Sequence, residues 1–523
     1  MVGSFWAFTP AIIAILLALI TKQVYVSLFF GIFVGAMMFA GGNPLEALFT
    51  LFQVMSEKVG ANVPIIVFLV VLGILVVLMQ KSGGAKAYGD WAGNKIKTKG
   101  GALASTAGLG CLIFVDDYFN CLTVGSVMRP VSDKFKVSRS KLAYIIDSTA
   151  APVCIIAPIS SWAAAVAGEL DGDGLTVFIQ TIPFNVYAIL TLVMVFTLCF
   201  FDFNFGKMRK NDRVTEETGD VHSGVSVESN NSLEEVKSNP HGKVRHLIIP
   251  VVVLILCCVG GMIYTGFFYN WDTGLIDSEP QSANLIEAFS NCDAGMSLAI
   301  GSTIALVIIA IYYMATKVVS FKEITGSFTD GFKAMVPAIL ILTFAWTLSA
   351  IMGAKGGYLD AQAFVNNNLQ DSSFPQFLFP AIFFVLAGLI AFATGTSWGT
   401  FGVLVPIAVT LLGGGSNVTT LMLMTVSATL GGAVFGDHIS PISDTTILAS
   451  AGAECNHVEH VNTQLPYAAL IAGISIVSYV IAGACASLGG VLSGLIMWVS
   501  ALAIFAGTAF LIMYLKKKKQ VNE

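Results

Sequence analysis

The chain has 523 residues, of which 55% are hydrophobic and 11% are charged, and its formal net charge is −5. Soluble domains carry about 25% charged residues, so this composition argues against a soluble protein and indicates one embedded in a lipid bilayer. The 9 cysteines lie mostly in apolar stretches without metal-ligand spacing, which argues against a disulfide framework or a metal centre.

Apolar stretches of helical length recur along the chain, and at about 20 residues per crossing the length allows ten or more membrane spans. The first 22 residues have no basic leader and no small-residue cleavage site, so we expect a retained span there and not a signal peptide. Two amphipathic segments, 45–58 and 319–333, are predicted to be interfacial helices. The expected spans lie at about 6–21, 24–41, 62–80, 175–200, 246–268, 294–315, 335–352, 374–394, 464–486 and 490–515.

The stretch 101–168 is apolar overall but interrupted by Gly, Pro, Ser, Thr and Asp. Its segment FVDDYFN holds two acidic residues, and a carboxylate at membrane depth costs about 2.5 kcal/mol or more unless it is paired, with Arg129 as the available partner. Neighbouring helical residues point about 100° apart, so one of the two is expected to face a site. Two prolines flank a short apolar run further on, which favours a re-entrant hairpin or unwound helix. The candidate ion or substrate ligands here are Asp116, Asp117, Asn120, Asp147, Ser148, Thr149, Ser160 and Ser161.

The polar stretch 202–245 is predicted to be a poorly ordered cytoplasmic linker between two halves. We therefore divide the chain into a first transmembrane repeat (1–201), this linker, a second transmembrane repeat (246–515) and a basic cytoplasmic tail (516–523). Lysines and arginines collect at 81–99, 207–213, 317–333 and 516–519, which places these segments in the cytoplasm by the positive-inside rule. Acidic connections without Lys or Arg, at 168–174 and 269–292, suit the outer face.

The stretch 395–455 is the second interrupted region. Its segments ATGTSWGTFG and GDHISPISDTTIL offer carboxylate, hydroxyl and carbonyl oxygens, which hard cations such as Na⁺ prefer. A histidine here is either a proton-responsive group or a hydrogen-bonding residue. His457 and His460 are expected in a solvated outer loop. The candidate ligands are Thr394, Thr396, Ser397, Thr400, Asp437, His438, Ser440, Ser443, Asp444 and Thr445.

Landmarks recur in the two halves in the same order. Pro64 precedes Gly83-Gly84 as Pro337 precedes Gly356-Gly357, and Pro158-Ile159-Ser160 matches Pro441-Ile442-Ser443. The charge distribution gives the equivalent helices 62–80 and 335–352 opposite directions. The predicted fold is therefore an all-α polytopic membrane protein with two inverted-topology repeats, re-entrant hairpins and discontinuous helices, an architecture typical of secondary transporters.

The motifs GTSWGTFG, GDHISPISDTTIL, HVNTQLPYA, FVDDYFN, SRSKLAYIIDSTAAP and PISSW resemble those of the NhaC-type Na⁺/H⁺ antiporter family, and the similarity covers nearly the whole chain outside the linker. This resemblance implies a sodium-dependent exchanger with inverted repeats, paired re-entrant hairpins and an elevator-like homodimer. Members of the family include Na⁺/H⁺ antiporters and sodium-linked exchangers of organic acids or amino acids.

The expected function is Na⁺ export in exchange for protons by alternating access. Na⁺ is predicted to bind Asp437, Ser443 and Asp444 together with Asp116 or Asp117. The alternative is a Na⁺- or H⁺-coupled carrier of an amino acid or organic acid, whose anionic group would bind helix N-termini or Arg129. A gated channel fits buried acids in paired hairpins less well.

An enzyme or an ATP-driven pump is not expected, because the chain has no HExxH or GxxxxGK[ST] motif. We expect no cofactor beyond the transported Na⁺ and H⁺ and no nucleic-acid partner. The partners are the lipid bilayer and small ions, with a small organic solute as the alternative, and the location is the inner cell membrane with a cytoplasmic C-terminus.

Overall fold

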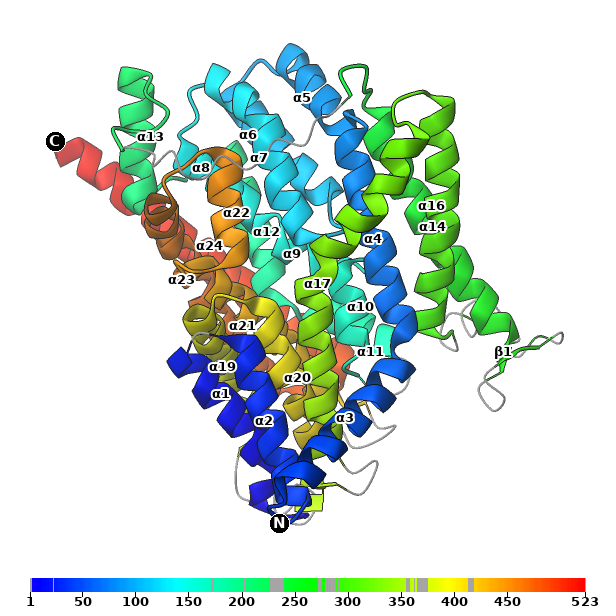
Figure 1. Ribbon diagram of the computed structural model, residues 1–523. Helices are drawn as coiled ribbons and strands as arrows, with labels where there is room; N and C mark the ends of the chain where they lie inside the picture. The colour runs from blue at the N-terminus through cyan, green and yellow to red at the C-terminus, as the bar shows by residue number, and fades with distance from the viewer. Residues whose placement is uncertain are drawn as a thin grey trace.

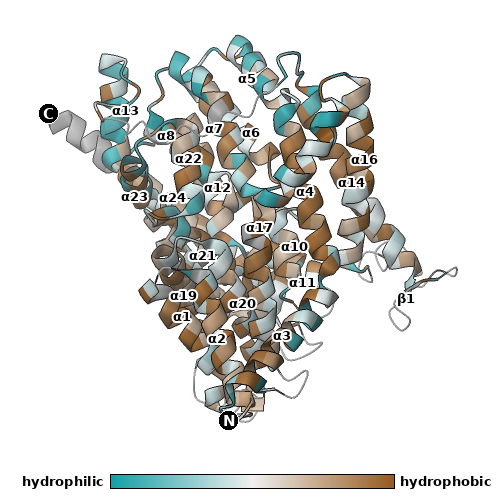
Figure 2. Ribbon diagram, in the orientation of Figure 1, coloured by the Kyte–Doolittle hydropathy of each residue, from teal (hydrophilic) through white to brown (hydrophobic). Residues whose placement is uncertain are grey.

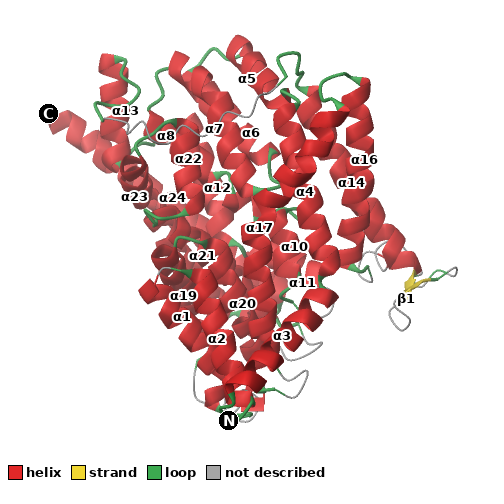
Figure 3. Ribbon diagram, in the orientation of Figure 1, coloured by secondary structure: helices red, strands yellow, loops and turns green. Residues whose placement is uncertain are grey.

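The computed structural model is built almost entirely of helices (Figure 3). It describes all residues except 1, 22, 171–173, 202, 226–238, 271–274, 278–279, 281, 283–287, 289–291, 354–357, 362, 365–374, 413–417 and 523. In this part of the chain, 7 helices are long and apolar enough to cross a membrane, or up to 10 if each bent helix pair counts as one span. The polytopic helical fold is confirmed. The predicted landmark Gly356-Gly357 lies outside the described residues.

The first half follows the predicted spans closely as far as residue 200. Asn43 caps α3 and Pro44 occupies its first turn. The chain bends by 117° between α2 and α3. The elements are η1 Phe5–Phe8, α1 Thr9–Thr21, α2 Val24–Phe39, α3 Pro44–Ala61, α4 Val63–Lys81, α5 Gly84–Lys95, α6 Lys99–Leu112, α7 Asp117–Lys134, α8 Arg139–Ser148, α9 Ala151–Cys154, α10 Ser161–Ala167, α11 Gly174–Thr181, η2 Ile182–Phe184 and α12 Val186–Phe200.

The second half contains one short hairpin, β1 Tyr269–Asn270 and β2 Leu275–Ile276, paired antiparallel with Tyr269 opposite Ile276. Its other elements are helical: α13 Gly206–Thr218, α14 Arg245–Phe268, α16 Ala294–Ala315, α17 Phe321–Met352, η4 Gln376–Leu378, α19 Phe379–Thr394, α20 Ser397–Leu412, α21 Thr420–Ile439, α22 Asp444–Ala453, α23 His457–Ala484, η5 Ala486–Leu488 and α24 Gly490–Asn522. Helices of the two halves interleave: α22 packs against α7 and α8, and α17 against α4 (Figure 1).

The amphipathic pattern of segment 319–333 predicted a separate interfacial helix, but the structure shows none there. The segment forms the beginning of the 32-residue helix α17. Gly331 of this segment packs so closely on Gly73 of α4 that a side chain at either position would collide with the main chain of the other helix. Lys81, at the end of α4, donates to Ser327 (3.0 Å) and Asp330 (3.1 Å) of α17, so the two helices run in opposite directions. The close contact between Gly73 and Gly331 buries one side of this segment against α4, and an amphipathic pattern alone does not reveal such a helix–helix contact.

Residues 206–218 of the predicted linker are helical, so the expectation that they are poorly ordered is wrong. They form the polar helix α13, which contacts α8 and α23. Lys207 donates to Glu459 of α23 (2.5 Å), so the basic segment and the start of α23 lie at the same end of the molecule. The sequence predicted opposite faces for these two segments. Polar residues of α13 bind partners from distant parts of the chain, which no local pattern reveals.

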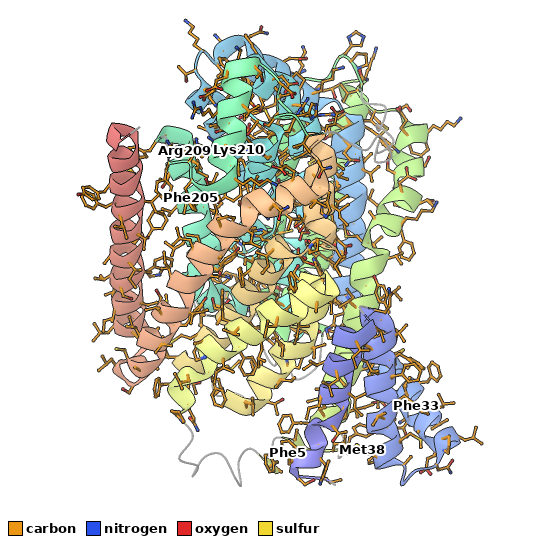
Figure 4. All side chains as sticks on the ribbon, turned by 90° about the vertical axis from the view of Figure 1, so that its left-hand side faces the viewer. Phe5, Phe33, Met38, Phe205, Arg209 and Lys210 are labelled. Carbon is orange, nitrogen blue, oxygen red and sulfur yellow. The ribbon has the colours of Figure 1, made fainter. Side chains whose placement is uncertain are left out.

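Hydrophilic residues gather at the end of the molecule formed by α5, α13 and the tops of the neighbouring helices (Figure 2). Arg209 and Lys210 of α13 lie there, while Phe5, Phe33 and Met38 lie at the opposite end (Figure 4). The chain starts at that opposite end, and α24 ends near the level of α13 (Figure 1). The predicted cytoplasmic segments 81–99, 207–213 and 317–333 are thus on one side of the molecule.

The crossing of α7 and α22 depends on two glycines. A Cβ atom on Gly125 of α7 would collide with the main chain of Gly452 in α22. We expect Gly125→Ala to force the helices apart and to lower the free energy of unfolding by about 1–3 kcal/mol. Thermal unfolding of the purified protein measures this change. Gly108→Ala is the control, because a Cβ on this helical glycine of α6 meets nothing within 4 Å; equal melting temperatures for the two variants would contradict the prediction.

Candidate ion-binding site

In the described part of the chain, four helix breaks surround the candidate site, and each contains a side-chain cap or a left-handed glycine. Asp116 caps α7 by accepting from the Phe119 amide (2.9 Å). Ser160 caps α10 and Ser443 caps α22, each by accepting from the amide three residues later. Gly395, with φ of 70°, ends α19. Side-chain caps and a left-handed glycine satisfy or redirect the main chain where no water is available.

The four breaks form two pairs, one in each half. In the first half, the Ser161 amide donates to the Val115 carbonyl (2.9 Å), which joins the break before α10 to the break before α7. In the second half, the Asp444 amide donates to the Gly395 carbonyl (3.3 Å), which joins the break before α22 to the break before α20. Ser161 and Asp444 occupy equivalent places in the sequences PISS and PISD. The same linkage therefore occurs in both halves, while the inverted-repeat relation stays a prediction.

The starts of α7, α10, α20 and α22 form a ring, which we call the helix-start ring. Trp162 of α10 donates to the Asp117 carboxylate of α7 (2.9 Å). The indole groups of Trp162 and of Trp398 in α20 pack together, with their centroids 5.6 Å apart. Tyr118 of α7 donates to Asp444 of α22 (3.4 Å), and the Asp444 amide closes the ring through its bond to the loop before α20. The ring thus joins helix starts of both halves, with Asp117 and Asp444 linked through Tyr118.

The carboxylates of the helix-start ring differ in their surroundings. Asp116 and Asp117 are both buried, but Asp116 points at the start of its own helix and Asp117 at Trp162. Asp444, in contrast, is exposed at the surface of the protein. These different partners agree with the expectation that the adjacent residues Asp116 and Asp117 point in different directions. Arg129, the predicted partner for these acids, is paired instead with Glu454 at the far end of α7.

Asp437 lies at the end of α21, next to the helix-start ring. It is 1% exposed, and its Oδ2 accepts from the Thr445 hydroxyl (2.7 Å), which in turn lies 3.3 Å from the Ser443 hydroxyl. Its Oδ1 is buried and has no hydrogen-bond partner. A cation that binds this oxygen would offset the cost of burying it. Asp437, Ser443 and Thr445 therefore offer adjacent oxygens from one short stretch of chain.

The described residues hold no group of three His, Cys, Asp or Glu side chains that could bind a metal ion by themselves. The predicted Na⁺ ligands are accordingly brought together only in part. Asp437 and Ser443 are linked through Thr445, and Asp444 is linked through Tyr118 to the residue beside it, Asp117. A Na⁺ ion here would depend on hydroxyl and main-chain oxygens as well as on carboxylates.

Several predicted hydroxyl ligands hydrogen-bond within the protein scaffold. Thr149, Thr394 and Thr400 donate to carbonyls four residues earlier in their own helices, as membrane helices often require. Ser440 donates to the Phe392 carbonyl (2.8 Å), and Thr396 accepts from the Gly399 amide (3.4 Å). The remaining three predicted serines, which are all buried, are Ser148, Ser161 and Ser397.

Asn120 joins three parts of the first half. Its amide nitrogen lies within 3.0 Å of the carbonyls of Gly110, Ile113 and Thr149, at the ends of α6 and α8. We expect Asn120→Ala to leave these buried carbonyls without a donor and to lower the free energy of unfolding by about 1–3 kcal/mol. Thermal unfolding tests this. Asn62→Ala serves as the control, because Asn62 is partly exposed and donates only to its own helix; a similar loss in both would exclude the proposed role.

Asp147 and His438 belong to a second buried network. Asp147 Oδ2 accepts from Gln464 (2.6 Å), Thr446 (3.1 Å) and His460 (3.3 Å). The His438 ring contacts the Tyr187 hydroxyl (2.9 Å), and its carbonyl accepts from Gln464 (2.7 Å). The prediction of a solvated loop at His460 is wrong, because His460 is fully buried on α23.

Sequence reasoning overlooked Trp162, Trp398, Tyr118 and Gln464, and it named Thr446 only as part of the polar cluster GDHISPISDTTIL. Two signals were available for part of this set. A Ser-Trp pair follows the break in each half, at 161–162 and 397–398. His460 and Gln464 are four residues apart and thus share one helix face within an apolar stretch. Tyr118 had no sequence signal of its own beyond the acidic pair before it.

The sequence model of the Na⁺/H⁺ antiporter family matches residues 174–484 of this chain. The chain belongs to the Na⁺/H⁺ antiporter family. An uncharacterized protein of Haemophilus influenzae is 37% identical to this family member over 499 residues, which are 92% of this chain and 91% of that protein. The family consists of transporters, so the expectation of a transporter and not an enzyme is confirmed.

Two further proteins are similar to this antiporter-family chain. The malate-2H⁺/Na⁺-lactate antiporter of Bacillus subtilis is 30% identical over 152 residues, which are 28% of this chain and 30% of that protein. The crystal structure of the YdaH transporter of Alcanivorax borkumensis matches with a TM-score of 0.45 and 15% identity, over 85% of this chain and 90% of that one.

Proposed function

We propose that this antiporter exports Na⁺ from the cell in exchange for protons by alternating access. The observation that carries the proposal is the helix-start ring, in which Asp444 of the second half binds the hydroxyl of Tyr118, the residue after Asp117 of the first half. Secondary transporters commonly place ion sites at the interface of two repeats, in discontinuous helices. The two paired breaks supply such helices here.

The chemistry of exchange follows from competition for buried oxygens. Burial disfavours a charged carboxylate, while a nearby cation favours it, so Na⁺ and H⁺ displace one another at the same group. Asp437 has a buried oxygen without a partner and hydroxyls beside it, which suits Na⁺. We propose Asp437, Ser443 and Asp444, with Asp117, as the Na⁺ ligands. Exchange results if the loaded forms cross between the two faces and the empty charged form does not.

The membrane orientation is part of the proposal. The hydrophilic end with α5 and α13 carries the basic segments, so we place it in the cytoplasm together with the end of α24. The opposed directions of α4 and α17 favour inverted repeats. The family resemblance favours the inner membrane and a homodimer.

Proteoliposomes loaded with a pH-sensitive dye test the proposed exchange. A Na⁺ gradient is expected to drive proton movement in the opposite direction, and an equal choline gradient is the control. The absence of any Na⁺-induced pH change in vesicles that contain folded protein would overturn the proposal.

A second candidate is the coupled transport of an organic anion. Three of the helix starts in the ring belong to helices of ten residues or more, α7, α20 and α22, and helix N-termini attract negative groups. The Bacillus relative is named as a carrier of malate and lactate. Uptake of labelled dicarboxylates, monocarboxylates and amino acids, with and without Na⁺, separates this candidate from simple cation exchange.

A further inference from the structure

The buried network around Asp147 lies apart from the proposed Na⁺ ligands. Asp147 belongs to α8, and its side chain is fully buried. Three donors share its Oδ2: Gln464 and His460 of α23, and Thr446 of α22. Its Oδ1 has no hydrogen-bond partner. Three side-chain donors thus hold this carboxylate in the interior of the protein. Na⁺ would have to compete there with hydrogen bonds that are already formed.

We propose that His460 and Asp147 form the proton-binding pair of this transporter, separate from the carboxylates that bind Na⁺. The inference rests on the proposed exchange of Na⁺ for H⁺. It assigns the proton to a histidine on α23, where the sequence had suggested a solvated loop.

The orientation of the His460 ring supports this role. Nε2 lies 3.3 Å from Asp147 Oδ2, while Nδ1 is buried without a partner. With Asp147 ionised, the hydrogen bond requires the proton on Nε2, so the neutral ring leaves a free lone pair on Nδ1. One proton added at Nδ1 converts the pair from a net charge of about −1 to about zero.

His438 is the competing histidine, and its contacts differ. Its Nδ1 contacts the Tyr187 hydroxyl (2.9 Å), and among the described residues no carboxylate forms a hydrogen bond with its ring. His460 has the carboxylate partner that stabilises an imidazolium. The titratable groups that face the pair from the surrounding helices are Cys121, Tyr144, Tyr187, Asp437, His438 and His457.

Two side chains connect the proton pair to the Na⁺ ligands. The Thr446 hydroxyl lies within hydrogen-bond distance of Asp147 (3.1 Å) and of the Asp437 carbonyl (3.2 Å). The Gln464 amide reaches Asp147 (2.6 Å) and the carbonyl of His438, the residue after Asp437. An imidazolium would draw the Asp147 carboxylate towards His460 and weaken its bond to Thr446. Proton binding thereby acts on the first turn of α22, where Ser443 and Asp444 lie.

The test compares proton release with Na⁺ binding in purified full-length protein. The variant is His460→Gln, whose amide still donates to Asp147 but takes up no proton. We expect Na⁺-induced proton release, measured with a pH dye in weak buffer, to fall about fivefold or more, while Na⁺ affinity at alkaline pH stays within about twofold. The decline of Na⁺ affinity on acidification should flatten. His241→Gln is the control, since this exposed histidine lies outside the network around Asp147.

The outcomes separate the inference from the proposed function. Absence of Na⁺-coupled proton movement in the wild-type protein would remove the proposed exchange. Wild-type exchange together with unchanged proton release and pH dependence in His460→Gln would overturn the proton pair alone.

A second variant and a measurement on the wild-type protein test the inference even if His460→Gln does not fold. Gln464→Glu adds a carboxylate beside Asp147 and should shift the pH profile of Na⁺ binding to alkaline values by about one unit. The Na⁺-induced infrared difference spectrum of the wild-type protein should show an imidazolium that loses its proton. A spectrum without histidine bands, or an unchanged profile in Gln464→Glu, contradicts the assignment.

Discussion

Asp437→Asn is expected to abolish Na⁺-coupled proton exchange while the protein still folds. The asparagine side chain has the same shape and keeps an oxygen that accepts from the Thr445 hydroxyl. It removes the negative charge from a side chain that is almost fully buried and has one unpartnered oxygen. Loss of a charged ligand in such a place costs about 2–5 kcal/mol, which corresponds to roughly 30- to 5,000-fold in Na⁺ affinity.

Sodium-22 uptake into acid-loaded proteoliposomes measures this effect, and gel filtration verifies the fold. Asp330→Asn is the matched control, because Asp330 pairs with Lys81 at an exposed position of α17 and lies outside the helix-start ring. We expect this control to transport like the wild-type protein. An Asp437→Asn variant with wild-type rates and an unchanged half-saturation concentration for Na⁺ would show that Asp437 is not a ligand.

The sequence alone located the helix breaks because their causes are local. Asp116, Ser160 and Ser443 are residues with short polar side chains that cap helices, and Pro158 and Pro441 precede two of the breaks. Short polar side chains favour helix starts and proline removes a backbone donor, so a cluster of such residues in an apolar stretch indicates a break. The apolar spans were predictable for the same reason, since length and hydropathy are properties of a single segment.

The partners of these residues were not predictable, because they come from distant parts of the chain. Tyr118 meets Asp444 across 326 positions, and His460 meets Asp147 across 313. His460 looked like a loop residue because the acidic residues Glu454 and Glu459 lie near it in the sequence. In the structure Asn456 caps α23, and Glu459 binds Lys207 and Asn211 of α13. The polar neighbours thus begin a buried helix.

Lys141→Met is expected to cause the largest loss of stability. The ammonium group of Lys141 is 2.8 Å from the Asp212 carboxylate, and the two side chains are 3% and 4% exposed. This pair attaches α13 to α8. Removal of one partner from a buried ion pair leaves the other charge uncompensated and costs about 3–5 kcal/mol. Lys99 lies 4.0 Å from the same carboxylate and compensates only in part.

Thermal unfolding of the single and double variants distinguishes the ion pair from simple loss of packing. In Lys141→Met/Asp212→Asn no unpaired charge is left, so we expect the double variant to recover much of the lost stability. A double variant that is less stable than Lys141→Met would show that the charge on Asp212 was not the problem.

Acid should weaken the same contact in the wild-type protein. Burial raises the pKa of Asp212, but the neighbouring Lys141 and Lys99 lower it by more, so its pKa lies below the ordinary carboxyl value. A carboxyl group with a lowered folded-state pKa stabilises the protein fully above about pH 4, the range in which the unfolded chain titrates, and this contribution is lost as the pH falls towards the folded-state pKa. The melting temperature of the wild-type protein should therefore fall more steeply between about pH 5 and pH 3 than that of the double variant, which has no carboxylate at position 212. Parallel curves would contradict the assignment of this ion pair as the acid-sensitive link between α13 and α8.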